Sequence, residues 1–410
     1  MTDDRRIAAF LGLRGGMVGL LGAVILVGMG EKIAERFLPI YLLAMGGGAI
    51  SVGLLNGLDN LLSALYAFPG GWLSDRYGAR RALLVFNLLA IFGFLIVIAV
   101  PSWGAVIVGS FFFLSWTAIS LPATMSLVGR LLPAGKRTMG VAMHSLVRRV
   151  PMALGPLLGG ALIDAYGETT GVRYAFVAAL AMALLACVLQ QKLIPEDREH
   201  DRAAPEKNPL RLFAHMNSAL RRLLVSDILI RFCEQIPYAF AVVWCMKTIE
   251  RPVTGFEFGI LTTVEMATAV LIYLPVAYMA DRTEKKPWVL TTFVFFTLFP
   301  VALMFSNSFW PLVGAFVLRG LKEFGEPTRK ALILDLAPEG RKAAVFGLYY
   351  LMRDSVVAVA AFAGAFLWNI DPRLNLWTAF AFGVLGTVWF VWRGEGFSPT
   401  PREGVGARPI

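Results

Sequence analysis

The stretch GGWLSDRYGARR, from Gly70 to Arg81, sets one carboxylate, three arginines and three glycines between two long apolar stretches. About 20 apolar residues are enough for a helix to cross a bilayer. In lipid the backbone must satisfy its own hydrogen bonds, so such stretches are expected to be helices. The quoted residues therefore predict a short polar loop between two membrane helices, with Gly78 allowing the tight turn.

The rest of the chain repeats this pattern of apolar stretch and short polar loop. The sequence has 410 residues, of which 57% are hydrophobic and 16% charged, whereas soluble domains carry about 25% charged residues. We expect an all-α membrane protein with twelve spans: 15–43, 51–73, 81–100, 104–129, 139–164, 174–191, 223–246, 257–280, 288–305, 310–334, 343–368 and 375–392. The three cysteines lack C-x-x-C spacing, so no metal site is indicated and no cofactor is expected.

Basic residues are distributed unevenly over the loops. Only four fall in the odd-numbered loops, namely Arg173, Lys247, Arg251 and Arg373, and most of the others lie in the tails and even-numbered loops. Lys and Arg accumulate on the cytoplasmic side of membrane proteins. This bias places both termini in the cytoplasm. It also accounts for the net charge of +10 without a nucleic-acid partner.

One long polar segment divides the spans into two equal groups. Residues 193–222 are rich in charge and contain prolines, which favours a cytoplasmic linker. The expected organisation is an N-terminal bundle of six helices over 1–192, the linker, and a second bundle with a short cytoplasmic tail over 223–410.

The two groups resemble each other in sequence. The segment PATMSLVGRLLPAGKR begins at Pro122, and PTRKALILDLAPEGRK begins 205 residues later at Pro327. A nearly equal offset aligns Asp75-Arg76 with Asp281-Arg282. Several matches at nearly one offset indicate an internal repeat. Parallel repeats of this kind are a transporter architecture, with the substrate site near the midplane between the halves.

The loop motif Gly71-x-Leu73-x-Asp75-Arg76-x-Gly78-x-Arg80-Arg81 resembles the signature loop of the major facilitator superfamily. The resemblance covers nearly the whole chain and implies twelve helices in two pseudo-symmetric bundles. It also implies a secondary transporter without enzyme activity. We expect a monomer in the lipid of a bacterial cytoplasmic (inner) membrane. The loop would be a cytoplasmic gate made by Gly71, Asp75, Arg76, Gly78 and Arg80, with Asp281 and Arg282 in a second copy degraded at Thr283 and Glu284; a topology signal is the alternative.

The fifth span carries a second, weaker resemblance. Gly155-Pro156-x-x-Gly159-Gly160 resembles the end of a motif of drug/proton antiporters, although Pro151 replaces an earlier glycine. The resemblance implies export, and plain helix packing is the alternative. The fourth span lacks the arginine of many proton-coupled members, which puts coupling through that position in doubt.

Charged residues inside spans are costly, about 2.5–3.5 kcal/mol each on insertion scales, and are functional candidates. The candidates for binding substrate or protons in the first, seventh and tenth spans are Glu31, Arg231, Glu234, Arg319, Lys322 and Glu323. Arg231 and Glu234 are three residues apart, so they can neutralise each other on one helix face. In the family the first, fourth, seventh and tenth spans line the cavity.

Two further pairs of candidates are related by the repeat. Asp59 matches Glu265, and Arg148 matches Arg353. The family packs the second span on the eleventh and the fifth on the eighth, so the resemblance allows Asp59–Arg353 and Glu265–Arg148 ion pairs. Either carboxylate could instead be a proton site.

These observations favour a secondary transporter of a small charged or zwitterionic solute. We expect an exporter coupled to protons through Glu31, Asp59, Glu265 or Glu323. An importer of organic anions that uses Arg148, Arg231, Arg319 and Arg353 is an alternative within transport. A membrane sensor or channel without coupled transport is the alternative class.

Overall fold

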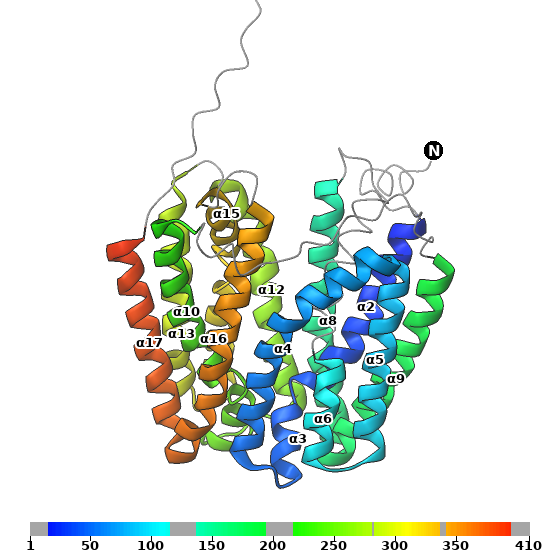
Figure 1. Cartoon of the computed structure of the whole chain (residues 1–410). Coiled ribbons are helices and arrows are strands. Elements are labelled where there is room, and N and C mark those ends of the chain that lie inside the picture. The colour runs from blue at the N-terminus through cyan, green and yellow to red at the C-terminus, as the bar shows by residue number, and fades with distance from the viewer. Residues whose placement is uncertain (1–14, 115–136, 194–215, 281–282, 337–341, 395–410) are drawn as a thin grey trace, which may run out of the picture.

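The computed structural model describes residues 15–114, 137–193, 216–280, 283–336 and 342–394, and within these ranges every regular element is a helix (Figure 1). The first half forms α2 (Gly15–Glu35), α3 (Leu38–Ala44), α4 (Gly48–Tyr77), α5 (Ala79–Ala99), α6 (Trp103–Phe113), α8 (Arg137–Tyr166) and α9 (Glu168–Leu193). The second half forms α10 (Ser218–Tyr238), α11 (Ala241–Val243), the π-helical η4 (Trp244–Thr248), α12 (Gly255–Ala280), α13 (Lys285–Met304), α14 (Phe309–Leu321), α15 (Glu326–Leu336), α16 (Lys342–Ile370) and α17 (Pro372–Arg393).

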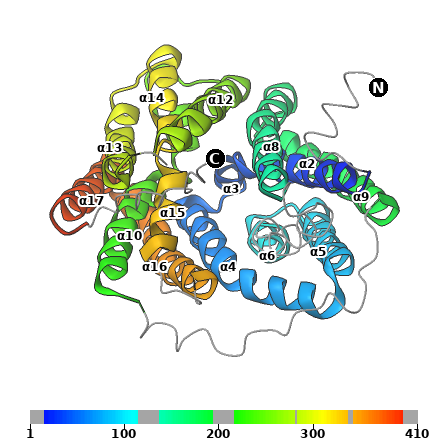
Figure 2. The ribbon, with the colours of Figure 1, turned by 90° about the horizontal axis from the view of Figure 1, so that it is seen from above.

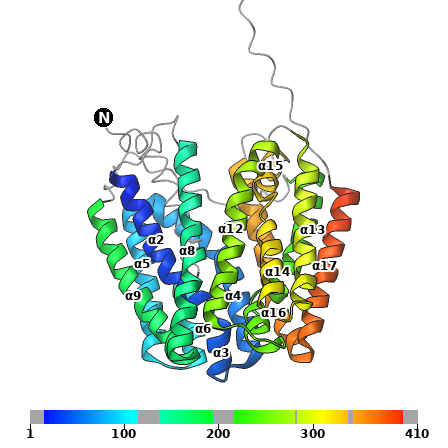
Figure 3. The ribbon, with the colours of Figure 1, turned by 180° about the vertical axis from the view of Figure 1, so that it is seen from behind.

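The helices form two bundles that stand side by side, as Figure 1 and the view from above in Figure 2 show. Between the bundles, α4 packs on α16 and α8 packs on α12; Figure 3 shows the second pair from behind. These contacts join the second predicted span to the eleventh and the fifth to the eighth. The packing that the family resemblance implies is therefore confirmed.

The number of membrane spans is confirmed only in part. Among the described residues, seven helices are long and apolar enough to cross a membrane, or eight if the bent pair Ser218–Tyr238 and Ala241–Thr248 is one span. Helices α6 and α14 are shorter apolar helices, and most of the predicted span 104–129 lies outside the described residues. The membrane-spanning all-α fold is confirmed, and a total of twelve spans stays a prediction.

Three of the predicted spans are broken in the structure. In the first, α2 ends at Glu35 and α3 begins at Leu38, with Pro39 in the first turn of α3, where proline is tolerated. In the seventh, α10 ends at Tyr238, next to Pro237, and the chain bends by 42°. In the tenth, α14 ends at Leu321 and α15 begins at Glu326. Residues at all three breaks line the space between the bundles.

Glycines of α8 allow close contact with helices on both sides. A Cβ atom on Gly159 would lie 2.0 Å from the carbonyl oxygen of Ile33 in α2. A Cβ atom on Gly160 would lie 2.1 Å from the carbonyl oxygen of Gly255 at the start of α12. No side chain larger than hydrogen fits either place without movement of a backbone. Gly155 makes a similar approach to Lys32, and Pro156 lies within the same helix.

The turn after α4 has the geometry expected from its sequence. Gly78 has φ of 87° and directly precedes α5. That φ lies in the left-handed region, which glycine adopts without the strain of a Cβ atom. The sequence prediction that Gly78 permits a tight turn between the second and third spans is confirmed.

Candidate functional site

A cavity of about 380 Å³ lies between the bundles. Its size is in the range of small-molecule sites, roughly 300–1,000 Å³. Six basic and five acidic side chains line it, together with two methionines, one glutamine and one tyrosine: Arg36, Asp59, Arg148, Arg149, Met152, Arg231, Glu234, Gln235, Tyr238, Glu265, Met266, Lys322, Glu323, Glu326 and Lys330. The lining comes from α4, α8 and α12 as well as from the first, seventh and tenth spans, so the cavity is built from more helices than predicted.

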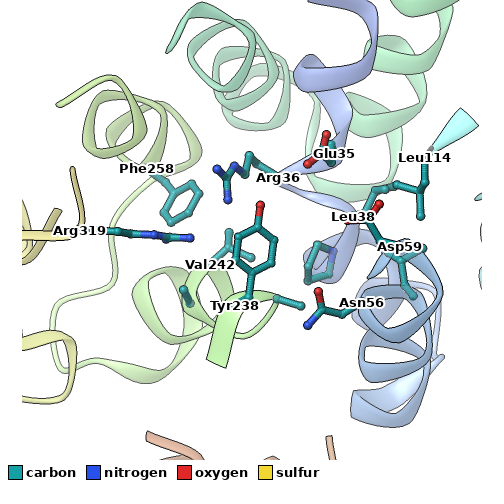
Figure 4. A pocket seen from close by; sticks show the side chains of 14 residues that line it. Glu35, Arg36, Leu38, Asn56, Asp59, Leu114, Tyr238, Val242, Phe258 and Arg319 are labelled. Carbon is teal, nitrogen blue, oxygen red and sulfur yellow. The ribbon is translucent and has the colours of Figure 1, made fainter. Parts of the chain in front are cut away.

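A smaller hollow of about 50 Å³ adjoins this cavity. The two spaces share Arg36, Asp59 and Tyr238 in their linings. Figure 4 shows the smaller one: Tyr238 lies in its middle, Arg319 and Asp59 lie on opposite sides of the tyrosine, and Arg36 lies near its hydroxyl group. The three shared residues therefore mark the border between the two spaces.

In the second half, the charged side chains of the cavity neutralise one another. Glu234 pairs with Arg231 on its own helix, as the sequence spacing predicts, and with Lys322 at 2.7 Å. Glu265, only 1% exposed, has Lys322 at 3.5 Å and Arg319 at 3.3 Å. Within the described part of the chain, the carboxylate oxygens of Glu265 accept no hydrogen bond of good geometry. The network joins α10, α12 and the tenth predicted span.

The guanidinium of Arg319 is also packed among aromatic rings. It lies 5.4 Å from the ring centre of Tyr238 and 5.0 Å from that of Phe299. Such contacts stabilise a cation that has left water. Arg319 is 3% exposed, so the structure holds it as a fixed charge with Glu265 as its counter-ion.

A second ionic cluster was not predicted from the sequence. Asp227 in α10 pairs with Arg329 of α15 and lies 3.5 Å from Arg353 of α16. It also accepts a hydrogen bond of 3.1 Å from the hydroxyl of Tyr349. Asp227 stands near the start of a span and Arg329 near the end of another, so both resembled ordinary boundary charges; their helical spacing from Arg231 and Glu326 was the available signal.

One ion pair of the cavity crosses between the halves. Arg149 of α8 donates to Glu323 at 3.1 Å. Glu323 was a candidate from the sequence. Its partner Arg149 was not, although the neighbouring Arg148 was. Because the pair joins two bundles, it can form only when they are close on this side.

The charge pairs that the repeat allowed are absent from this structure. Arg353 contacts Asp227 and Asp354, not Asp59. Glu265 contacts Arg319 and Lys322, not Arg148. Sequence equivalence fixed the helix on which each charge lies but not its depth or rotation, and nearer partners are available within the second half. For the conformation described here, both predicted pairs are wrong.

Glu31, a sequence candidate for binding substrate or protons, lies in an ion-pair cluster of α2. It is buried in α2, where Lys32 lies at 3.2 Å and also pairs with Glu35. Glu31 lines neither of the two spaces described above, whereas Glu35 lines the smaller one and the next residue, Arg36, lines both. In the first span, the residues that line these two spaces therefore begin at Glu35, one helical turn after Glu31.

Three charged residues of the cavity have no ion pair or hydrogen bond within the described part of the chain: Arg36, Asp59 and Arg148. All three belong to the first half. The remaining contact of Arg36 is with the ring of Tyr238, 5.1 Å from its centre. The cavity thus combines a neutralised wall in the second half with available charges in the first.

The predicted cytoplasmic gate is described only in part. Arg80 hydrogen-bonds the carbonyl oxygen and the side chain of Gln191 in α9, and Arg76 lies over the ring of Tyr77. Asp281 and Arg282 lie outside the described residues, as does the side chain of Asp75. The proposed gating contacts of Asp75 thus stay a prediction.

Two helical bundles around a charged central cavity define a multi-pass membrane protein with the architecture of a transporter. The family model for the Major Facilitator Superfamily matches residues 20–249 and, a second time, residues 228–409. The chain belongs to the major facilitator superfamily.

Known relatives agree with this membership. An uncharacterized MFS-type transporter, MJ1317 of Methanocaldococcus jannaschii, is 21% identical over 85% of this chain and 87% of that protein. The multidrug resistance protein MdtH of Sodalis glossinidius is 23% identical over 88% of this chain and 87% of its own. The crystal structure of the peptide transporter POT in complex with sulfate has a TM-score of 0.76 at 15% identity, covering 96% of this chain and 97% of that one. That structure supports the fold.

Proposed function

We propose that this protein is a secondary transporter that moves a small charged or zwitterionic solute by alternating access. The observation that carries the proposal is the cavity of about 380 Å³ between the halves, lined by six basic and five acidic side chains. Charged groups within a membrane protein are expensive and face water, a partner or a substrate. A neutral sugar would leave the unpaired charges of this cavity without partners.

We further propose that transport is export coupled to protons. The name of MdtH, a multidrug resistance protein, supports export, and so does the resemblance of residues 155–160 to drug/proton antiporters. Of the four carboxylates suggested as proton carriers, Asp59 has no ion pair with the described residues, whereas Glu31, Glu265 and Glu323 each have at least one. Asp59 can therefore gain or lose a proton without breaking an ion pair.

Orientation and domain limits belong to the same proposal. The uneven distribution of Lys and Arg supports cytoplasmic termini, and the long polar segment 193–222 supports a cytoplasmic linker between two bundles over 1–192 and 223–410. We expect cysteines placed at Ser218 and Ser398 in a cysteine-free variant to resist an impermeant maleimide added to intact cells. Permeabilised cells are the control. Labelling of either cysteine from outside would contradict the topology.

Transport can be tested in proteoliposomes loaded with a pH-sensitive dye. A panel of amino acids, dipeptides, nucleosides, organic anions and quaternary amines is added with and without an imposed pH gradient. We expect at least one charged or zwitterionic solute to move in the direction opposite to protons. Protein-free liposomes should show no such movement. Solute movement that ignores the pH gradient would remove proton coupling, and a steady ion current would indicate a channel. No solute movement would contradict transport.

The same panel distinguishes the proposed export from the alternative function, import of organic anions. The available charges of the cavity include two arginines, Arg36 and Arg148, and only one carboxylate, Asp59. This excess of positive charge favours anionic groups. Accumulation of a simple monocarboxylate in the direction of the proton gradient, with no response to zwitterions, would support the alternative.

A further inference from the structure

Two of the three charges available to a ligand, Arg36 and Asp59, lie at the same end of the cavity. Arg36 and Asp59 line both the cavity and the adjoining hollow. Arg148 lies elsewhere: α2 and α8 run side by side with Gly28 against Pro151, which puts Arg148 about 16 Å from the level of Arg36 at 1.5 Å per residue. One cation, Arg36, and one anion, Asp59, thus remain at the end of the cavity that adjoins the smaller hollow.

Contacts with the opposite half hold the segments of chain that carry both charges. The guanidinium of Arg36 lies over the ring of Tyr238, at 5.1 Å, and no described residue accepts a hydrogen bond from its N–H groups. The segment of α4 that carries Asp59 is held against α10, because Asn56 and Asn60 donate hydrogen bonds to Gln235 at 3.0 and 3.2 Å. Both anchors belong to α10, in the opposite half of the molecule.

The surrounding charges cannot take these roles. Glu35 pairs with Lys32, and Glu234 pairs with Arg231 and Lys322. Arg319 lies on the side of Tyr238 opposite to Asp59 in Figure 4, and its counter-ion is Glu265. A ligand that carries a single charge would satisfy one of the two open groups and leave the other without a partner.

We propose that Arg36 and Asp59 form a binding site for a zwitterion, with Arg36 binding its carboxylate and Asp59 its ammonium group. The inference rests on the proposed transport function and names the substrate class. An arginine binds a carboxylate through two parallel hydrogen bonds, and an ionised aspartate accepts hydrogen bonds from an ammonium group. Asp59 can also serve in proton coupling, because its carboxylate binds either a proton or an ammonium group. Since Arg36 packs on Tyr238, the ligand lies where the two halves meet.

Binding is measurable without transport, on purified protein in detergent at fixed pH. The probes are the ω-amino acids from glycine to 6-aminohexanoate, with butanoate and butylamine as singly charged counterparts of 4-aminobutanoate. Calorimetry should show that at least one amino acid binds tenfold or more tightly than either counterpart. Equal affinity for the singly charged compounds, or no binding of any amino acid, would overturn the site.

Variants assign the two ends of the ligand. In Arg36→Gln the best amino acid should bind no better than butylamine, and in Asp59→Asn no better than butanoate. Arg36→Lys and Asp59→Glu, which retain the charges, should recover part of the affinity if a neutral variant folds poorly. Arg373→Gln, an exposed change at the start of α17, controls for net charge. Full affinity in both neutral variants would place the ligand elsewhere.

The binding assay and the liposome assay fail independently. Selective binding that depends on Arg36 and Asp59, without solute movement in liposomes, would retain the site and reject the transport function. Transport of a zwitterion whose affinity ignores both residues would retain the function and reject the site.

Discussion

Asp227 is a buried carboxylate with three partners in the second half. It is 1% exposed, and Arg329, Arg353 and Tyr349 approach it from α15 and α16. Removing one member of a buried ion pair leaves the others as uncompensated charges, which costs more than the pair contributes. The residue therefore connects three helices and is expected to control the stability of this half.

We predict that Asp227→Asn lowers the free energy of unfolding by about 3–5 kcal/mol, the usual cost of breaking a buried pair. Tyr349→Phe should cost less, about 1.5–3 kcal/mol, because it removes one hydrogen bond to a charged acceptor. Thermal unfolding followed by tryptophan fluorescence in detergent checks the order of the two effects. Equal midpoints for the two variants would contradict the assignment of Asp227 as the centre of the cluster.

Asp59 and Arg353 show what sequence could not fix at the scale of single residues. The repeat located both charges on helices that do pack together, α4 and α16. The rotation of a helix about its axis and the choice among several nearby carboxylates depend on packing across the whole bundle. Arg353 consequently lies against Asp227, which stands near the start of a predicted span and resembled an ordinary boundary charge.

A double-mutant cycle tests this difference. In the conformation described here, Asp59→Asn and Arg353→Gln should have additive effects on stability, within about 0.5 kcal/mol, because they do not touch. The cycle of Asp227→Asn with Arg353→Gln should deviate from additivity by more than that. Coupling in the Asp59 cycle would show that the pair allowed by the repeat forms in another populated state.

At the scale of elements, the start of α12 is held by the opposite half. Asp164 of α8 accepts hydrogen bonds of 2.8 Å from the backbone N–H groups of Gly255 and Phe256. A carboxylate at a helix N-terminus satisfies free donors and interacts favourably with the helix dipole. Near it, Lys247 of the second half pairs with Glu168 of the first. This end of the molecule, opposite to the start of α2 and the end of α17, is therefore closed by contacts between the halves.

We predict that Asp164→Ala opens this end. Val242, which is 3% exposed and lines the smaller hollow, is changed to cysteine in a cysteine-free background. Loss of charge-assisted hydrogen bonds worth about 1.5–3 kcal/mol should raise its labelling by an impermeant maleimide roughly tenfold or more. Asp371→Ala is the matched control, since Asp371 caps α17 within one half. An equal rise in the control would contradict a specific latch.

The elements themselves were largely predictable. Apolar length and the loops located helices in all predicted spans, and the Gly78 turn and the Arg231–Glu234 pair followed from local spacing. The helix breaks after Glu35 and after Leu321 could not be predicted from local spacing. Residues at both breaks line the spaces between the bundles, and such contacts cannot be seen in a local stretch of sequence.

At the scale of the whole molecule, two carboxylates stand at opposite ends of the interface between the halves. Asp164 joins the halves at the end away from the termini. Asp75 belongs to the loop at the other end, where the family resemblance implies a latch that forms when the cytoplasmic side is closed. A contact present in only one of two states shifts the population toward that state. The two residues should thus favour opposite conformations.

The last prediction combines them. Asp75→Asn should allow folding but slow transport, and it should lower the labelling of Val242→Cys below that of the parent protein, because the state closed near Asp164 gains population. The double variant Asp164→Ala, Asp75→Asn should return the labelling rate toward the parent value, since shifts of one equilibrium by distant residues add as free energies. Normal transport and labelling in Asp75→Asn would reduce the loop to a topology signal. Equal labelling of Asp164→Ala with and without the second change would leave Asp164 alone in control of this equilibrium.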